Sequence, residues 1–311
     1  MIWMMSQPLK MQQNLRKSLG FFTLGLIAVV GLPGCAVLSG TSSTPTTVAS
    51  NSDQTEIPPI KTGGSSSTVN FLQTLTTAYT DTLETAEVDL LQPGQSENII
   101  AGVVQGLIDV GTISRGYLKP EETDEALNFH ATAQDAIVVA THPNVTGVSN
   151  LTTEELKGIY SGTITNWRQL GGPEANIQLL DRPEDESAKR LLRESYLGAD
   201  LPNSPNAIVL REETELIQTL QSTPYSIGAF SLAYAISHNL PVNRLSLNGI
   251  TPTPETLKIG QYPMARTIGL LWNKNASDST TEFVNYIFSP QGAAVMEQSG
   301  FAPLPQPTDL K

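Results

Sequence analysis

The stretch that decides the fold is LTTEELKGIYSGTITNWRQLGG at residues 151–172, followed by IQLL at 177–180 and DRPEDESAK at 181–189. Thr152 and Glu155, three residues apart, form a capping-box pattern that predicts a short helix ending near Gly162. The apolar run at 177–180 predicts a buried strand, and a polar loop then leads into a predicted helix over 188–196. A strand followed by a polar loop and a helix N-terminus presents free backbone N–H groups, which suit an anion. The stretch therefore predicts a ligand-binding loop.

Helical and strand patterns alternate along the rest of the folded part. Apolar residues recur at helical spacing from Val69 to Leu83, with Ser67 or Thr68 as the N-cap. Further helices are predicted over 97–107, 213–221, 280–288 and 291–298, and strands over 88–91, 108–113, 136–140, 226–230 and 268–272. This alternation predicts parallel sheets with helices on their faces.

Composition limits the class of protein. A chain of 311 residues with 39% hydrophobic content can bury two modest cores. The net charge of −12 argues against nucleic acid as a partner. The first 35 residues hold three basic residues and no acidic one, which leaves 15 of the 18 basic residues against all 30 acidic ones. Such an acidic chain must bind an anion through a local pocket.

The N-terminal part has the features of an export signal. Three basic residues precede the apolar run at 19–30, and Leu-Pro-Gly-Cys follows, ending at Cys35. Residues 1–35 therefore predict a secretory signal peptide of the lipoprotein type, which resembles a bacterial lipobox with Cys35 as the lipidated residue. The alternative, a short transmembrane anchor, is disfavoured because the run is shorter than about 20 apolar residues. Cys35 is the single cysteine, so no intrachain disulfide forms, and the Ser/Thr-rich residues 36–56 predict a flexible tether.

The sequence of residues 151–172, together with the strand and the loop that follow, resembles that of the PstS-like phosphate-binding proteins of bacterial ABC importers. Further motifs fall in the family's order: GSSSTV at 64–69, DVGTISR at 109–115, IG at 227–228, NGITP at 248–252, YP at 262–263 and FAPL at 301–304. The resemblance covers about residues 57–304.

The resemblance implies an α/β fold of the two-domain, periplasmic-binding-protein-like type (type II). Each domain would be a sheet flanked by helices, with a ligand cleft between the domains that closes by hinge motion. Residues 57–140 plus 240–311 would form domain I, and residues 141–239 domain II.

The resemblance also implies three binding loops, which start after the predicted strands. The candidate ligand-binding residues are Ser66, Ser67, Thr68, Ser96, Ser114, Arg115, Arg182, Ser187, Ala188 and Lys189. Arg115 and Arg182 would supply the main charges, because a guanidinium pairs bidentately with tetrahedral oxyanions. A plain helix cap at 65–68 and an interdomain salt bridge at Arg115 are the structural alternatives. Gln95 and Glu97 replace glycines of the family, and this change can reshape the pocket.

The sequence leaves the selectivity of the pocket open. In some relatives the position of Arg115 holds an aspartate that accepts the proton of hydrogen phosphate and so rejects sulfate. The acceptor could instead be Asp181, Asp185, Glu186 or Glu97. With an arginine at 115, the sequence predicts weaker exclusion of sulfate or arsenate than in relatives that carry the aspartate.

These patterns predict an extracytoplasmic solute-binding lipoprotein, anchored to the outer face of the bacterial cytoplasmic membrane. The resemblance implies that it would capture inorganic phosphate, or a related oxyanion, and deliver it to ABC permease subunits. We expect a monomer without cofactor or metal. An enzyme is not expected, because the sequence has no nucleophile elbow, phosphate-binding loop, dinucleotide motif or His-x-x-x-His pair. The alternatives are a ligand-sensing lipoprotein without a transport role and a phosphate-ester hydrolase.

Overall fold

The computed structural model describes residues 58–83 and 86–305, which fall within one compact unit, residues 56–311. Its main sheet has the strand order β2-β1-β3-β11-β4-β8-β6-β7, and β9 and β12 also pair with β4. The larger strands are β1 (Ile60–Gly64), β2 (Val88–Leu90), β3 (Val110–Ile113), β4 (Leu127–Thr141), β6 (Gln178–Asp181), β8 (Ser226–Ser231) and β11 (Ala265–Asn273). The two-residue strands are β5 (Asn150–Leu151), β7 (Ile208–Val209), β9 (Asn243–Arg244), β10 (Ser246–Leu247) and β12 (Ala302–Pro303).

The α-helices of the described residues connect these strands, and most of them lie close to the predicted bounds, but the short helices over 232–237 and 254–258 were not predicted from the sequence. They are α1 (Val69–Thr82), α2 (Ser96–Val104), α3 (Thr153–Ser161), α4 (Ser187–Leu192), α5 (Glu213–Ser222), α6 (Leu232–Ser237), α7 (Pro254–Lys258), α8 (Asp278–Ile287) and α9 (Pro290–Gln298). Short 3-10 turns cover Pro120–Glu122 and Trp167–Leu170, and a π-helical turn at Arg193–Leu197 continues α4.

The sheet is parallel at its two ends and antiparallel in its centre. β1 runs parallel to β2 and β3, and β6 runs parallel to β7 and β8. β11 is antiparallel to β3 and β4, and β4 is antiparallel to β8. The prediction of parallel sheets is therefore wrong for the centre. The predicted strand 136–140 is only the end of the 15-residue β4.

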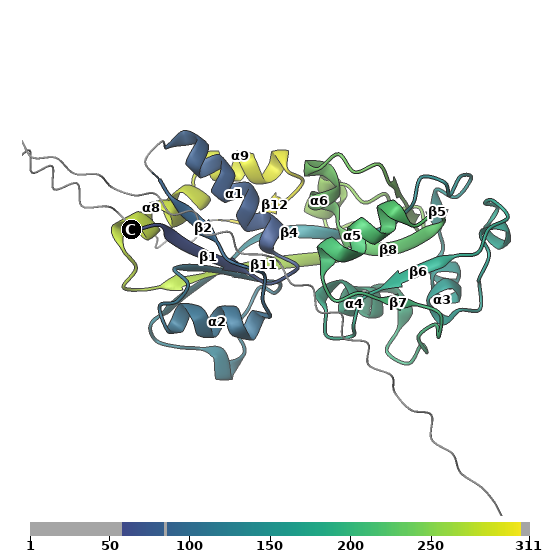
Figure 1. Ribbon diagram of the computed structural model, residues 1–311, viewed down its shortest axis with the longest axis horizontal. Helices are drawn as coiled ribbons and strands as arrows, with labels where there is room; N and C mark the ends of the chain where they lie inside the picture. Colours follow the sequence, from purple (N-terminus) through teal and green to yellow (C-terminus); the bar gives the residue numbers. More distant parts are fainter. Residues whose placement is uncertain (1–57, 84–85, 306–311) are drawn as a thin grey trace, which may run out of the picture. The chain divides into compact units, whose positions relative to one another are not determined.

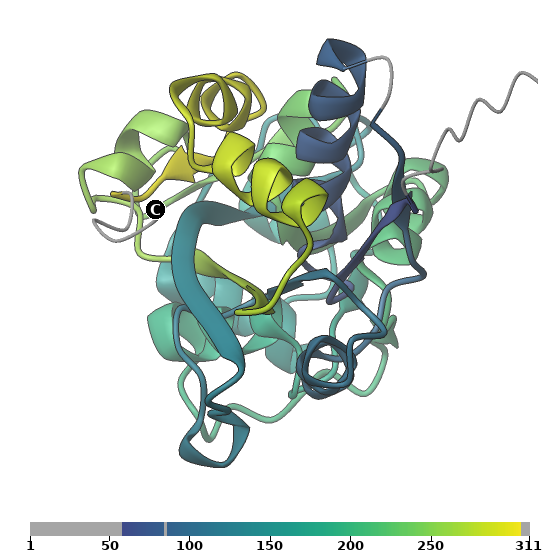
Figure 2. The same cartoon turned by 90° about the vertical axis from the view of Figure 1, so that its left-hand side faces the viewer.

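In the described part of the chain, buried apolar residues form three clusters, and the two that pack on opposite faces of the same part of the sheet are taken together as the first of two cores. The first core draws most of its residues from 60–133 and 268–301, with α1, α8 and α9 on one face of the sheet and α2 on the other (Figures 1 and 2). The second core draws most of its residues from 136–264. β4 and β11 belong to both. The division into 57–140 plus 240–311 and 141–239 stays a prediction, although the packing of Leu245, Leu257 and Met264 favours counting this segment with the second core.

The capping box predicted at the start of α3 is present. The Thr152 hydroxyl accepts from the backbone N–H of Glu155, and the Glu155 carboxylate accepts from the backbone N–H of Thr152 at 2.8 Å. Gly162 ends α3 at φ 79°, a left-handed conformation that glycine adopts without strain. Trp167 is fully buried, and its Nε1 donates to the Tyr225 carbonyl at 2.8 Å. These contacts hold the turn after α3 against the residues that precede β8.

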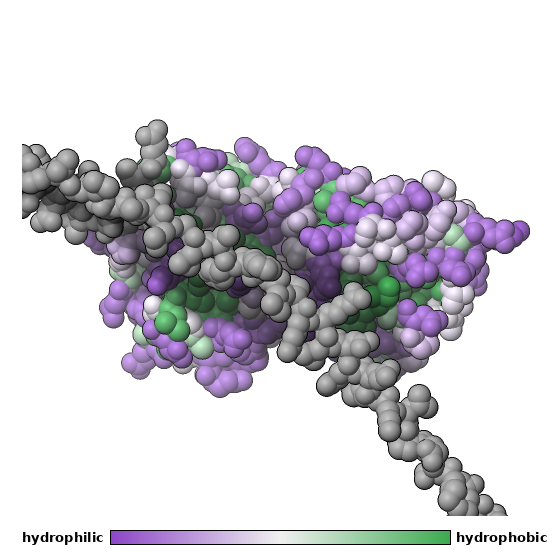
Figure 3. Space-filling model, viewed as in Figure 1, coloured by the Kyte–Doolittle hydropathy of each residue, from purple (hydrophilic) through white to green (hydrophobic). Residues whose placement is uncertain are grey.

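Polar residues cover much of the face shown in Figure 3, with apolar residues in smaller patches. Across residues 58–83 and 86–305, no helix has the length and apolar character needed to span a membrane. The predicted signal peptide, Cys35 and the tether lie outside the described residues.

Candidate functional site

The first two predicted loops lie side by side. β1 leads into Ser65, which forms a parallel bridge with Gly94 of the second loop. The backbone N–H of Ser66 donates to the Gly94 carbonyl at 3.2 Å, and that of Gly94 donates to the Gly64 carbonyl at 3.0 Å. Both loops follow the carboxyl ends of parallel strands, where α/β sheets bind their ligands.

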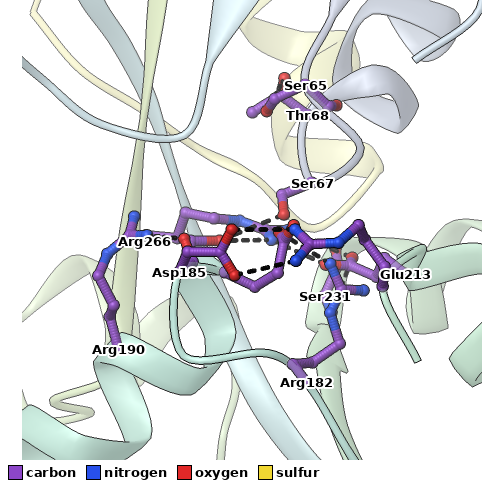
Figure 4. A network of polar contacts seen from close by, with 12 residues as sticks. Ser65, Ser67, Thr68, Arg182, Asp185, Arg190, Glu213, Ser231 and Arg266 are labelled. Atoms are coloured by element: carbon purple, nitrogen blue, oxygen red, sulfur yellow. Dashed lines mark hydrogen bonds and ion pairs between the residues drawn. The ribbon is translucent and has the colours of Figure 1, made fainter. Parts of the chain in front are cut away.

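The third loop reaches the first across the boundary between the two cores. Ser67, just before α1, and Ser187, at the start of α4, approach to 3.3 Å between their hydroxyl oxygens. Both side chains are buried. Figure 4 shows Ser67 pointing down toward Arg266, with Arg182 rising from the opposite side. The structure thus brings together two serines that lie 120 residues apart in the sequence.

Arg182 is the predicted residue with the most unusual surroundings. Its guanidinium is buried, and its Nη2 donates to Glu186 Oε2 at 2.9 Å. Nε and Nη1 are buried too, yet neither has a hydrogen-bond partner. Its backbone N–H donates to Asp181 Oδ1 at 2.8 Å, which fixes the loop. Because buried donors are costly when unpaired, this guanidinium is suited to an anionic ligand.

Arg266 is a site residue that the sequence reasoning missed. It lies on β11 directly opposite Asp135 of β4, and its Nη2 donates to Asp135 Oδ2 at 2.6 Å. Its Nη1 donates to Glu213 Oε2 at 2.9 Å and contacts the Ser187 hydroxyl at 3.4 Å, while its Nε has no partner. The sequence feature that could have revealed this pair is a charged residue just before each predicted apolar strand, Asp135 before 136–140 and Arg266 before 268–272.

Burial and neighbouring charge set the ionisation of this trio. Burial raises the pKa of Asp135, Arg266 acts in the opposite direction, and Glu213 adds to the increase. Burial disfavours the charge of Arg266, but Glu213 and Asp135 outweigh it and raise the pKa of Arg266. The guanidinium of Arg266 is therefore paired with two carboxyl groups, those of Asp135 and Glu213, at the junction of the two cores.

The guanidinium of Arg115 hydrogen-bonds to neighbours in its own segment and not to the residues of this cluster. Its guanidinium pairs with both carboxylate oxygens of Glu122 at 2.7 Å and also donates to the Tyr117 carbonyl. The expectation that it supplies a free charge to the ligand is not met, because a carboxylate only seven residues away occupies its fork. The pair is also not the interdomain bridge considered as the alternative, since both residues belong to the segment between β3 and β4. Ser114 and Ser96 are half-buried.

The side chain of Lys189 also points away from the cluster. The Lys189 ammonium is fully buried, where it contacts the Asp181 carboxylate, donates to Asn203 Oδ1 at 3.0 Å and lies 5.1 Å from the centre of the Tyr160 ring. It therefore adds no donor beside Arg182, contrary to the prediction, because Asp181 attracts it into the second core.

The remaining predicted residues support the loops. The Thr68 hydroxyl bonds with Thr112 Oγ1 and with Ser65 Oγ, each at 2.9 Å, so it holds the first loop rather than facing a ligand. Ser66 and Ala188 are buried.

Two cores that share two long strands, with loops from both cores meeting at buried arginines, define a two-lobed solute-binding protein of type II fold. The sequence profile of the PBP superfamily domain matches residues 41–291. The PstS phosphate-binding protein of Borreliella burgdorferi is 30% identical over 210 residues, 65% of this chain and 75% of that protein. The PstS phosphate-binding protein of Bacillus subtilis is 27% identical over 223 residues, 71% of this chain and 72% of that protein. The chain therefore belongs to the PBP superfamily, as one of its PstS-like proteins.

A solved structure shares the fold. It is the crystal structure, with bound phosphate, of a candidate phosphate ABC transporter substrate-binding protein from Clostridium perfringens. The TM-score is 0.68 at 23% identity, and the match covers 80% of this chain and all of that one.

Proposed function

We propose that this chain captures inorganic phosphate, or a related oxyanion, and delivers it to an ABC permease. The PstS-like relatives are phosphate-binding proteins by name, which supports this ligand class. The observation that carries the proposal is the buried guanidinium of Arg182, whose Nε and Nη1 lack partners while the Ser67 and Ser187 hydroxyls meet at the boundary between the cores.

The pocket would act through donors from both cores. Arg182 would offer two parallel N–H groups to an oxyanion, which gives charge and geometric selectivity together. Ser67 from the first loop and Ser187 from the third would add hydroxyl donors, and Arg266 would add positive charge from β11. A ligand that contacts both cores stabilises their closed arrangement by its differential affinity for that arrangement.

We also propose the setting in which this binding takes place. Residues 1–35 would act as the export signal and Cys35 as the lipidated residue, so that the chain is held at the outer face of the cytoplasmic membrane. Residues 36–56 would be a tether with a root-mean-square reach of roughly 25 Å, enough for the binding unit to reorient above a permease.

Calorimetric titration of the purified full chain with phosphate tests the proposal. We expect saturable binding of one phosphate, while chloride at equal ionic strength gives no binding heat. If phosphate, arsenate and sulfate all fail to bind, the proposed function is wrong. Phosphate binding by a chain that co-purifies with no permease from membranes would favour the sensing role instead.

A further inference from the structure

The loop that carries Arg182 and Asp185 (Figure 4) ends at Glu186, the residue that precedes α4. The Glu186 side chain makes no cap hydrogen bond to that helix. Its Oε2 accepts from Arg182 Nη2 at 2.9 Å, and its Oε1 accepts from Arg211 Nη1 at 3.3 Å. Only 7% of the side chain is exposed. Among the described residues, two arginines therefore set the orientation of this carboxylate.

Arg211 is itself held in place by other contacts. Its Nη1 and Nη2 donate to the two carboxylate oxygens of Asp185 at 3.0 and 3.3 Å, the two-pronged geometry that a guanidinium favours. The hydrogen bond from Arg211 lowers the pKa of Asp185, so this pair is ionised at neutral pH. The backbone N–H of the preceding residue, Leu210, donates to the Asp181 carbonyl at 3.0 Å. Arg211 is thus fixed beside the loop that carries Arg182.

The ion pair between Glu186 and Arg182 uses only part of the guanidinium. A carboxylate and a guanidinium favour two parallel hydrogen bonds, yet Arg182 donates to Glu186 from Nη2 alone. In the described part of the chain, Arg182 Nε and Nη1 have no partner. The second oxygen of Glu186, which could complete the pair, accepts from Arg211 instead. Arg182 therefore keeps the donors that the proposed function assigns to the oxyanion.

We propose that Arg211 is a positioning residue, which holds one oxygen of Glu186 away from Arg182 and so keeps a bidentate edge of Arg182 free for the ligand. This inference rests on the proposed function. Without Arg211, the Glu186 carboxylate would lose one of its two partners while it stays buried, and a second hydrogen bond to Arg182 would replace the lost one. The ligand would then have to break this bond before it could pair with the guanidinium.

Other basic side chains near the loop do not take this part. Arg190 of α4 donates to the Asp185 carbonyl, and the Arg266 guanidinium is paired with two other carboxyl groups. Arg211 lies 25 residues after Glu186 and reaches it because β7, which ends two residues before Arg211, pairs with β6 at the start of the loop. The side chain of Arg211 is 49% exposed, so its substitution removes little buried surface.

Calorimetric titration of the full chain with phosphate compares three substitutions. Arg211→Met should weaken phosphate binding by at least about tenfold, because the ligand must break a charge-assisted hydrogen bond. Arg211→Lys keeps the positive charge but not the two-pronged donor, so it should weaken binding by a smaller factor. Arg168→Met is the control for the loss of one positive charge, because Arg168 is a surface residue paired with Glu174 at 3.1 Å, and it should leave the affinity unchanged.

A double-mutant cycle separates positioning from the loss of a charge. Glu186→Gln removes the carboxylate that would cover Arg182, and its effect on phosphate affinity is measured in the unaltered chain and in the Arg211→Met variant. We expect Glu186→Gln to increase the affinity of the Arg211→Met variant by a factor at least about fivefold larger than any increase in the unaltered chain. Melting temperatures without ligand show that each variant is folded at the temperature of the titration.

Equal effects of Glu186→Gln in the two backgrounds overturn the inference, as does an Arg211→Met variant that binds phosphate as tightly as the unaltered chain. If Arg211→Met does not fold, Arg211→Lys takes its place in the cycle, and equal effects of Glu186→Gln again count against the inference. Failure of the unaltered chain to bind any oxyanion refutes the proposed function instead.

Discussion

Replacing Arg266 by methionine leaves two buried carboxyl groups without the guanidinium that joins them. Asp135 lies 2.6 Å and Glu213 lies 2.9 Å from Arg266, and all three side chains are almost completely buried. Removing one partner of a buried ion pair costs about 3 to 5 kcal/mol, because the remaining charge is uncompensated. We therefore expect Arg266→Met to lower the free energy of unfolding by at least about 3 kcal/mol at pH 8.

The loss should depend on pH. Burial raises the pKa of Asp135, and removing Arg266 takes away the charge that opposes this increase. The folded variant would then bind a proton that the unfolded chain releases, so its stability falls as pH rises, by about 1.4 kcal/mol per pH unit for one proton. The deficit should accordingly be smaller at pH 6 than at pH 8, by about 1.4 kcal/mol for each pH unit over which the buried carboxyl group stays protonated.

Urea unfolding followed by tryptophan fluorescence at both pH values measures the two quantities. Arg168→Met is the matched control, because Arg168 pairs with Glu174 at 3.1 Å but both side chains are more than two-thirds exposed. This control should lose no more than about 0.5 kcal/mol. A deficit of less than about 1 kcal/mol for Arg266→Met, or one that is equal at pH 6 and pH 8, would refute the reasoning.

Three further expectations concern the ligand and the anchor. Arg182→Ala should weaken phosphate binding at least about tenfold, whereas Lys189→Ala should chiefly lower stability, since its ammonium contacts Asp181; equal losses of affinity in calorimetry would contradict this assignment. Saturating phosphate should reduce the radius of gyration and raise the melting temperature by mass action, and scattering curves that superimpose would exclude closure. The Cys35→Ser variant should be lost from the membrane fraction or accumulate as an uncleaved precursor, because stable membrane anchoring needs two acyl chains and a single chain binds only marginally. An unchanged size and location of the variant would argue against lipidation.

Local signals predicted the helices better than the central strands. The Thr152 and Glu155 cap and the left-handed Gly162 act over a few residues, so the bounds of α3 could be read from the sequence. The first half of β4 contains polar residues that are only partly buried, and its pairing with β11 depends on a segment more than 100 residues later. No local pattern encodes that pairing, and for this reason only the fully buried end of β4 was predicted.

The same limit applies to the site. The resemblance pointed to Ser67, Ser187 and Arg182, and the structure brings their loops together. The resemblance could not show that the Arg115 guanidinium pairs with the Glu122 carboxylate. Whether this guanidinium faces a ligand or a carboxylate seven residues away depends on how the chain turns after β3. Arg266 was missed because its partners are remote in the sequence and become neighbours only once the strands pair.

The order in which the chain is synthesised delays the pairing of the strands that the two cores share. β3 is paired on one side by β1 and on the other by β11, which is made only after residues 136–264 of the second core. As the chain emerges, β3 and the first half of β4 therefore present unpaired edges until Ala265–Asn273 arrives, although the second core is already continuous. Such open edges promote association between nascent chains. Export of the finished polypeptide before it folds would remove this hazard, and a chain that stops short of β11 would retain it permanently.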